Sequence, residues 1–132
     1  MQKTDKFSFI LKPSTIPNAG VGVFALHDID KDTYMELFLP DFEEEILDIK
    51  DIPEELQMYC LDRQDDKLQC PKYFNRMDIG NYLNHSENAN LKWEEGKGKG
   101  YFASRNIKKG EELFSNYKEL GEPENKRDNY IA

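Results

Sequence analysis

The stretch Ile79-Gly-Asn-Tyr-Leu-Asn-His-Ser-Glu-Asn-Ala-Asn90 decides how the rest of the chain is interpreted. Four side chains able to hydrogen-bond, those of Asn84, His85, Ser86 and Asn90, fall within seven residues, next to an apolar pair and without any Lys or Arg. Such a cluster can simply satisfy the backbone of a turn, as Ser and Asn side chains often do. It can also belong to a binding site, and the choice depends on the flanking motifs.

The length and composition are those of one soluble domain. With 132 residues, a hydrophobic fraction of 38% and a mean hydropathy of -0.83, the chain can bury a single modest core. Its apolar runs stay below the roughly 18 residues that a membrane helix requires. We therefore expect neither a membrane protein nor a secretion precursor.

The net charge of -8 comes from one acidic block. Residues 41–66 contain 11 acidic side chains against Lys50 and Arg63, so this block carries -9 and the rest of the chain +1. The block is either a solvated face or mobile insert, or it steers a basic partner such as a lysine-rich peptide. Direct nucleic-acid binding is disfavoured because it requires clustered Lys and Arg.

Metal and hydrolase chemistry find little support in the sequence. Cys60 and Cys70 lie outside any metal-binding spacing, and His27 and His85 are the only histidines. We expect no metal site and two free thiols in a reducing compartment, rather than a disulfide. No nucleophile elbow of the Gly-x-Ser-x-Gly kind is present, and this disfavours a serine hydrolase.

Hydrophobic alternation and turn residues predict a chain made mostly of short strands with little helix. A helical turn is expected where Pro53 opens Glu-Glu-Leu-Gln, and another over 77–83. The expected strands are 7–12, one starting at Val21, 33 to about 39, 58–62 paired with 67–70, 91–93 and 101–104.

Two segments 78 residues apart echo each other. The segment 22–32 aligns with 100–110, with five identities in eleven positions. Two copies are too few for a solenoid, so the echo predicts one domain built from two similar strand-turn-strand units, unless similar hairpin chemistry arose independently.

Motifs on both sides of residues 79–90, called the organising stretch below, indicate what this stretch does. Asn18-Ala-Gly-Val-Gly-Val-Phe-Ala25 precedes it, and Phe102-Ala-Ser-Arg-Asn-Ile-Lys-Lys-Gly110 and Gly110-Glu-Glu-Leu-Phe-Ser-Asn-Tyr117 follow it. In this order the motifs resemble the SET domain of protein-lysine methyltransferases, particularly the small stand-alone viral and bacterial members. The resemblance covers residues 7–117, nearly the whole chain, although Asn81, Glu87 and Ala89 depart from the family's Asn-His-Ser motif.

The resemblance implies a fold and a cofactor. The fold would be a β-clip-like SET domain of several small sheets, in which the Asn-His-Ser segment threads through a C-terminal loop as a pseudoknot. The cofactor would be S-adenosylmethionine, and the methyl acceptor the side-chain amine of a lysine. Residues placed by the resemblance in the cofactor site are Gly20, Val21, Gly22, Tyr82, Asn84, His85 and Tyr117.

The resemblance also assigns roles on the substrate side. Tyr117 falls on the family's catalytic tyrosine, unless it is only a core aromatic. Phe38 and Ser115 replace aromatic residues usual in the lysine channel, so they can change how many methyl groups are added, or leave a binding module that holds cofactor or peptide without efficient turnover. Asp48 and Asp51, in the acidic insert at about 41–70, would hold a basic substrate.

The remaining expectations concern the ends of the chain and its surroundings. The SET domain would span 1–117, and a polar tail at 118–132 would follow, with Tyr130 a candidate to cover the site. The partner would be a basic lysine-containing protein such as a histone tail, and a homodimer is compatible with the sequence. We expect an intracellular location, cytoplasmic in a bacterium and nuclear in a virus or eukaryote.

Overall fold

The computed structural model describes residues 2–95 and 100–121. Within these ranges, fifteen short elements follow one another, and only one of them is an α-helix. In chain order they are β1 (Phe9–Pro13), β2 (Val21–Ala25), β3 (Tyr34–Met35), β4 (Glu44–Asp48), η1 (Ile49–Asp51), α1 (Glu54–Gln57), β5 (Leu61–Arg63), β6 (Lys67–Pro71), η2 (Phe74–Arg76), η3 (Ile79–Tyr82), β7 (Asn84–His85), β8 (Leu91–Glu94), β9 (Gly100–Ala103), β10 (Glu112–Ser115) and η4 (Tyr117–Leu120). The prediction of a mostly β chain is confirmed.

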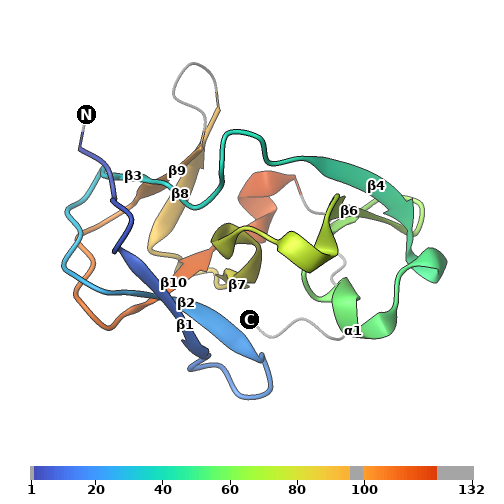
Figure 1. The fold of residues 1–132 in the computed structure, drawn as a ribbon, viewed down its shortest axis with the longest axis horizontal. Coiled ribbons are helices and arrows are strands. Elements are labelled where there is room, and N and C mark those ends of the chain that lie inside the picture. The colour runs from blue at the N-terminus through green and yellow to red at the C-terminus, as the bar shows by residue number, and fades with distance from the viewer. Residues whose placement is uncertain (1, 96–99, 122–132) are drawn as a thin grey trace.

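The strands form three small sheets, with strand orders β1-β2-β10-β7, β3-β9-β8 and β4-β6-β5. Figure 1 shows the β4-β6-β5 sheet at one end of the long axis and the other two sheets toward the opposite end. The first two sheets share one core, centred on fully buried side chains such as Val23, Leu37, Leu91, Ile107 and Leu113. The third sheet has its own small core around Ile52 and Leu68.

The two echoing segments pair with each other and have the same backbone bonding pattern. Ile29 and Ile107 exchange both backbone hydrogen bonds, each at 2.8 Å. The flanking bonds repeat with the same offset of 78 residues, since Asp32 N–H donates to the Ala103 carbonyl and Gly110 N–H donates to that of Ala25. The two turns therefore pack as a pseudo-twofold pair, and this pairing brings β2 beside β10.

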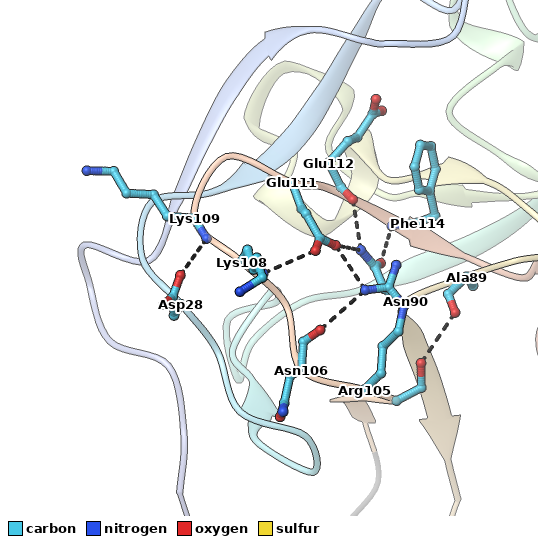
Figure 2. A network of polar contacts seen from close by, with 11 residues as sticks. Asp28, Ala89, Asn90, Arg105, Asn106, Lys108, Lys109, Glu111, Glu112 and Phe114 are labelled. Atoms are coloured by element: carbon cyan, nitrogen blue, oxygen red, sulfur yellow. Dashed lines mark hydrogen bonds and ion pairs between the residues drawn. The ribbon is translucent and has the colours of Figure 1, made fainter.

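Side chains complete the same symmetry at the turns. The Asn106 side-chain oxygen accepts from the Lys31 backbone, and Asp28 accepts from the Lys109 backbone, both at 2.8 Å. Figure 2 shows the Asp28–Lys109 contact at the edge of a larger polar network. The Asn106 amide and the Asp28 carboxylate therefore occupy equivalent positions in the two units, because the oxygen of either group can accept a hydrogen bond from a turn N–H.

The predicted strand from Thr33 to about Leu39 is wrong in its second half, because β3 ends at Met35. The Leu37 N–H bonds back to the Met35 carbonyl at 2.8 Å, which closes a tight turn and ends the strand. The turn directs Phe38 toward Gly80, where a Cβ would lie 2.4 Å from the ring. Tertiary packing against that glycine replaces the extended conformation that the local sequence favours.

The acidic block is folded as the third sheet. Its predicted hairpin of β5 and β6 and its short helix α1 after Pro53 are present, whereas β4 was not predicted. β4 pairs antiparallel with β6 over five residues and carries mostly exposed acidic side chains. Cys60 and Cys70 are both buried and are not joined by a disulfide in the described residues.

The organising stretch joins β10 from the other side. β7 pairs in parallel with β10, with Asn84 opposite Phe114 and His85 opposite Ser115. The buried Asn90 amide then holds the end of the stretch to β10, since it donates to the Glu112 carbonyl at 2.9 Å and accepts from the Phe114 N–H at 2.8 Å, as Figure 2 shows. The pseudoknot threading stays a prediction.

Candidate active site

The candidate site has a polar side, which is a hydrogen-bonded network around the buried carboxylate of Glu112. Glu112 begins β10, and its side chain points to the opposite side of the strand from Glu111 in Figure 2. Its two oxygens accept from the Ser14 hydroxyl at 2.8 Å and 3.1 Å, and from the Thr15 N–H and hydroxyl at 2.8 Å and 2.6 Å. The Asn84 amide donates to the same carboxylate at 3.0 Å. Glu112 thereby connects the loop after β1 with β7.

Asn84 is fixed in a single orientation by these contacts. Its Nδ2 donates both to Glu112 and, at 3.1 Å, to the Val21 carbonyl. Both partners are acceptors only, so the amide nitrogen must face them, and Oδ1 must point the other way. Within the described residues no hydrogen bond reaches Oδ1, and it is therefore available as an acceptor for a bound ligand.

The two glycines of the Gly20-Val-Gly22 motif serve different purposes. A Cβ at Gly22 would lie 2.2 Å from the Glu112 carboxylate and 3.2 Å from the Asn84 amide nitrogen, so this position admits only glycine beside the buried network. Gly20 adopts a φ of +73° after a turn, and a Cβ there would approach only Met58, at 3.7 Å. Thus Gly22 is required by packing and Gly20 by backbone conformation.

His85 and Tyr117 connect the polar side to a cavity. The buried His85 ring accepts the Tyr117 N–H on Nδ1 at 3.0 Å, and the two rings lie 5.1 Å apart. The Tyr117 hydroxyl donates to the Leu83 carbonyl. The imidazole therefore positions the tyrosine backbone, in agreement with a structural role for His85 rather than acid or base catalysis.

A cavity of about 710 Å³ opens on the far side of Tyr117. Aromatic rings form a large part of its wall, and its charged members are Glu36, Glu44, Glu95 and Arg63. The lining rings include Tyr34, Phe38, Tyr59, Trp93, Tyr101 and Tyr117. Leu83 and Tyr117 line the cavity, whereas their neighbours Asn84 and His85 do not, so the hydroxyl contact of Tyr117 lies where the two sides meet.

Tyr101 and Ser115 form a buried hydroxyl pair at the cavity. Their oxygens lie 2.9 Å apart, and the two residues are only 6% and 2% exposed. Burial raises the pKa of Tyr101 to about 12, with the Ser115 hydrogen bond opposing that shift and the Glu44 and Glu119 carboxylates adding to it. Phe38 stacks on Tyr101 at 6.3 Å, and the Trp93 ring meets its face at 5.0 Å.

The structure brings most of the predicted site residues together. Val21, Gly22 and Asn84 share the polar network, while Phe38 and Tyr117 line the cavity. Tyr82 packs against Tyr59, with ring centroids 5.4 Å apart.

The two predicted acidic residues lie elsewhere. Asp48 pairs with Lys67 at 2.6 Å on the β4-β6-β5 sheet, and neither Asp48 nor Asp51 lines the cavity. The tail residue Tyr130 is outside the described residues.

Sequence reasoning missed Glu112 and Tyr101. Glu112 stood in the quoted Gly-Glu-Glu-Leu motif, but the sequence did not reveal which of the two glutamates is buried. Strand alternation does not indicate it either, because it places Glu112 on the opposite face of β10 from the core residue Leu113. Tyr101 was expected in a strand, and its pairing with Ser115 gives no sequence signal because the two residues lie on different strands.

Within residues 2–95 and 100–121, no group of three His, Cys, Asp or Glu side chains is placed so that it could hold a metal ion. No helix in those ranges has the length and apolar character needed to cross a bilayer.

Solved structures share this fold at low sequence identity. A candidate histone methyltransferase from Plasmodium falciparum aligns with a TM-score of 0.51 and 21% identity, over 86% of this chain and 95% of its own. The methyltransferase domain of human PR domain-containing protein 2 aligns with a TM-score of 0.54 and 21% identity, over 83% and 76%. A chain of ctPRC2, solved in an autoinhibited conformation bound to S-adenosylmethionine, aligns with a TM-score of 0.55 and 20% identity, over 86% of this chain and 15% of its own.

The sequence itself matches a family profile but no curated protein. The search of curated proteins returned no significant match. The SET domain profile matches residues 20–118, which include Gly22, Asn84 and Glu112 of the polar network, the organising stretch and Tyr117. The chain therefore belongs to the SET domain family.

Proposed function

We propose that this protein is a protein-lysine methyltransferase that uses S-adenosylmethionine. The observation that carries the proposal is the position of Tyr117, whose hydroxyl meets the Leu83 carbonyl between the polar network and the aromatic cavity. A methyl donor on the polar side and a lysine side chain in the cavity would meet at this point. The match to the SET domain family and the fold shared with methyltransferase structures support the proposed activity.

The polar side fits the amino-acid end of the cofactor. Asn84 is held so that its Oδ1 is an acceptor for an ammonium group, and the buried Glu112 carboxylate behind it favours positive charge. Val21 and Gly22 supply backbone beside the same amide. When bound, S-adenosylmethionine supplies an activated methyl group on a positively charged sulfur.

The aromatic side fits a neutral lysine amine. Desolvation between rings disfavours the ammonium form and lowers the pKa of a buried lysine, so no strong general base is required. The Leu83 carbonyl and the Tyr117 hydroxyl are the polar groups that would orient the amine. Holding the amine in line with the methyl group is the main contribution to rate that these residues make.

The acidic residues around the cavity support a basic substrate. Glu36, Glu44 and Glu95 line the cavity, so basic residues flanking the target lysine would be attracted to its mouth. A histone tail or another lysine-rich protein has this chemistry, and a location inside the cell follows from such a substrate.

Transfer of a labelled methyl group tests the proposal. Purified protein is incubated with labelled S-adenosylmethionine and mixed histones, and Tyr117→Phe is compared with the control Tyr73→Phe, whose exposed ring lies outside the cavity. We expect label in histones with wild type and control, and a loss of about 100-fold or more with Tyr117→Phe, the range for removal of one active-site donor. Saturable cofactor binding without transfer to any protein would instead support a binding module.

A further inference from the structure

Within the described residues, the charge of Glu112 has no cationic partner. The residue is only 6% exposed, and the donors to its carboxylate are neutral: the Ser14 and Thr15 hydroxyls, the Thr15 N–H and the Asn84 amide. Among residues 2–95 and 100–121 no Lys or Arg forms an ion pair with it. Buried carboxylates are normally paired with a cation, because an isolated buried charge is costly.

The hydrogen bonds keep this carboxylate ionised. Burial alone would raise the pKa of Glu112, but donation from Thr15, Asn84 and Ser14 outweighs burial and holds the pKa below its usual value. The site therefore carries a fixed negative charge in the absence of ligand. Protein surroundings of low polarity make such a charge act over a longer range than a surface charge does.

The charge is transmitted to the ligand side through Asn84. The amide nitrogen donates to Glu112, so the amide dipole is aligned with its negative end, Oδ1, directed away from the carboxylate. Hydrogen bonds in series polarise one another, which makes Oδ1 a stronger acceptor than an isolated amide oxygen. A ligand on this side meets both the polarised amide and the field of Glu112.

We propose that Glu112 makes the site select the positively charged methyl donor over the product left after transfer. This inference rests on the proposed function. S-adenosylmethionine and S-adenosylhomocysteine share the same amino-acid and adenosine groups, and they differ by a methyl group and by one unit of positive charge on sulfur. A fixed negative charge stabilises the first more than the second, so binding of the donor is strengthened and the product dissociates more readily.

Calorimetric binding of both ligands to the protein without peptide tests the inference. The measured quantity is the ratio of the two Kd values, product over donor. A ratio above one is expected for wild type, and Glu112→Gln should lower it by on the order of tenfold, the size of effect expected when one attraction between unit charges is lost in a partly desolvated site.

Two variants separate charge from structure. Glu111→Gln removes the same charge from the adjacent residue, whose carboxylate lies on the other face of β10 and contacts Arg105. Thr15→Val deletes the hydroxyl that donates to Glu112 at 2.6 Å but keeps the carboxylate. Glu111→Gln is expected to retain the wild-type ratio, and Thr15→Val is expected to lower it less than Glu112→Gln does, even where it weakens the binding of both ligands.

A ligand series on wild type keeps the inference testable if Glu112→Gln does not fold. An analogue with a tertiary amine in place of the sulfonium is cationic below the pKa of that amine and neutral above it. Its affinity should fall about tenfold as the amine loses its proton.

The possible results are distinct. Equal loss of both ligands in Glu112→Gln, or equal affinity of wild type for the two ligands, would overturn the charge selection while leaving the methyltransferase proposal standing. Failure of wild type to bind either ligand would overturn both.

Discussion

The two sides of the candidate site are built by opposite means. On the polar side, Glu112, Asn84 and Gly22 are held by directed hydrogen bonds and by a contact that leaves no room for a Cβ. On the aromatic side, Phe38 and Tyr101 form walls through ring packing, and their one buried polar link is the hydroxyl pair with Ser115.

The difference indicates how each side tolerates change. Hydrogen-bonded networks around a buried charge fail when one member is displaced, because the remaining groups stay desolvated without partners. Packed rings can readjust, and volume-conserving changes usually cost little. We therefore expect substitutions on the polar side to cost much stability, and volume-conserving substitutions on the aromatic side to cost little.

Gly22→Ala should have the largest effect. The new Cβ would lie 2.2 Å from the Glu112 carboxylate, so the network must open, at a cost of about 2–3 kcal/mol in the free energy of unfolding and more than about tenfold in cofactor affinity. Denaturant unfolding and calorimetry measure the two quantities. Gly20→Ala is the control, since its Cβ meets nothing closer than 3.7 Å and only the backbone strain of φ +73°, about 1–2 kcal/mol, is expected. Equal losses of stability and affinity in the two variants would contradict the claim that the polar network does not tolerate displacement.

The Tyr101–Ser115 pair should show coupling. Tyr101→Phe leaves the buried Ser115 hydroxyl without this partner, and Ser115→Ala does the same to Tyr101, so each should cost about 1–3 kcal/mol. The double variant should cost less than the sum, by at least about 0.5 kcal/mol, because no polar group then remains unpaired at this place. Urea unfolding of the four proteins checks this, and strict additivity would show that the pair is not a unit.

The same tyrosine gives a dependence on alkaline pH. The pKa of Tyr101 is about 12 in the folded protein and near 10.0 in the unfolded chain, so between these values the unfolded state loses the proton first. Stability should therefore fall as the pH rises from 10 to 12, by roughly 2–3 kcal/mol for this group. Chemical unfolding across that range in wild type and Tyr101→Phe measures the difference. A variant with the same slope as wild type would contradict the assignment.

The acidic residues should have the smallest effects, and they divide into two sets. Neutralising Glu36, Glu44 and Glu95 together should raise KM for a basic peptide at low salt more than neutralising Asp48, Asp51, Glu54 and Glu55 does. The first set lines the cavity and the second does not, although each contains one ion-paired member, Glu36 with Lys3 and Asp48 with Lys67. Peptide methylation at two salt concentrations distinguishes the sets, because screening weakens attraction between exposed charges. A larger effect from the second set would restore the sequence prediction.

The sequence predicted the fold where patterns are local. The echo of 22–32 in 100–110 indicated two units, and Pro53 indicated the short helix α1. It failed where distant residues decide the conformation. β3 ends at Met35 because the chain turns to pack Phe38 on Gly80, 42 residues later, and no window around Phe38 contains that information.

The candidate site was predicted by motifs rather than by physical patterning. Gly22, Asn84 and Tyr117 were assigned through the family resemblance, and their contacts agree with a common site. The structure adds a reason for Gly22, since it places the Glu112 carboxylate against this glycine. Glu112 could not be chosen over Glu111 without knowing which face of β10 meets the loop after β1.

The central claim is that donor and lysine occupy opposite sides of Tyr117, and amide chemical shifts measured by NMR test it most directly. Addition of S-adenosylmethionine should shift the amides of Val21, Gly22 and Asn84, and a later addition of a lysine peptide should shift those of Phe38 and Tyr101. Leu83 and Tyr117 should respond to both ligands. Cofactor shifts centred on the cavity residues, or no saturable shift at all, would contradict the account.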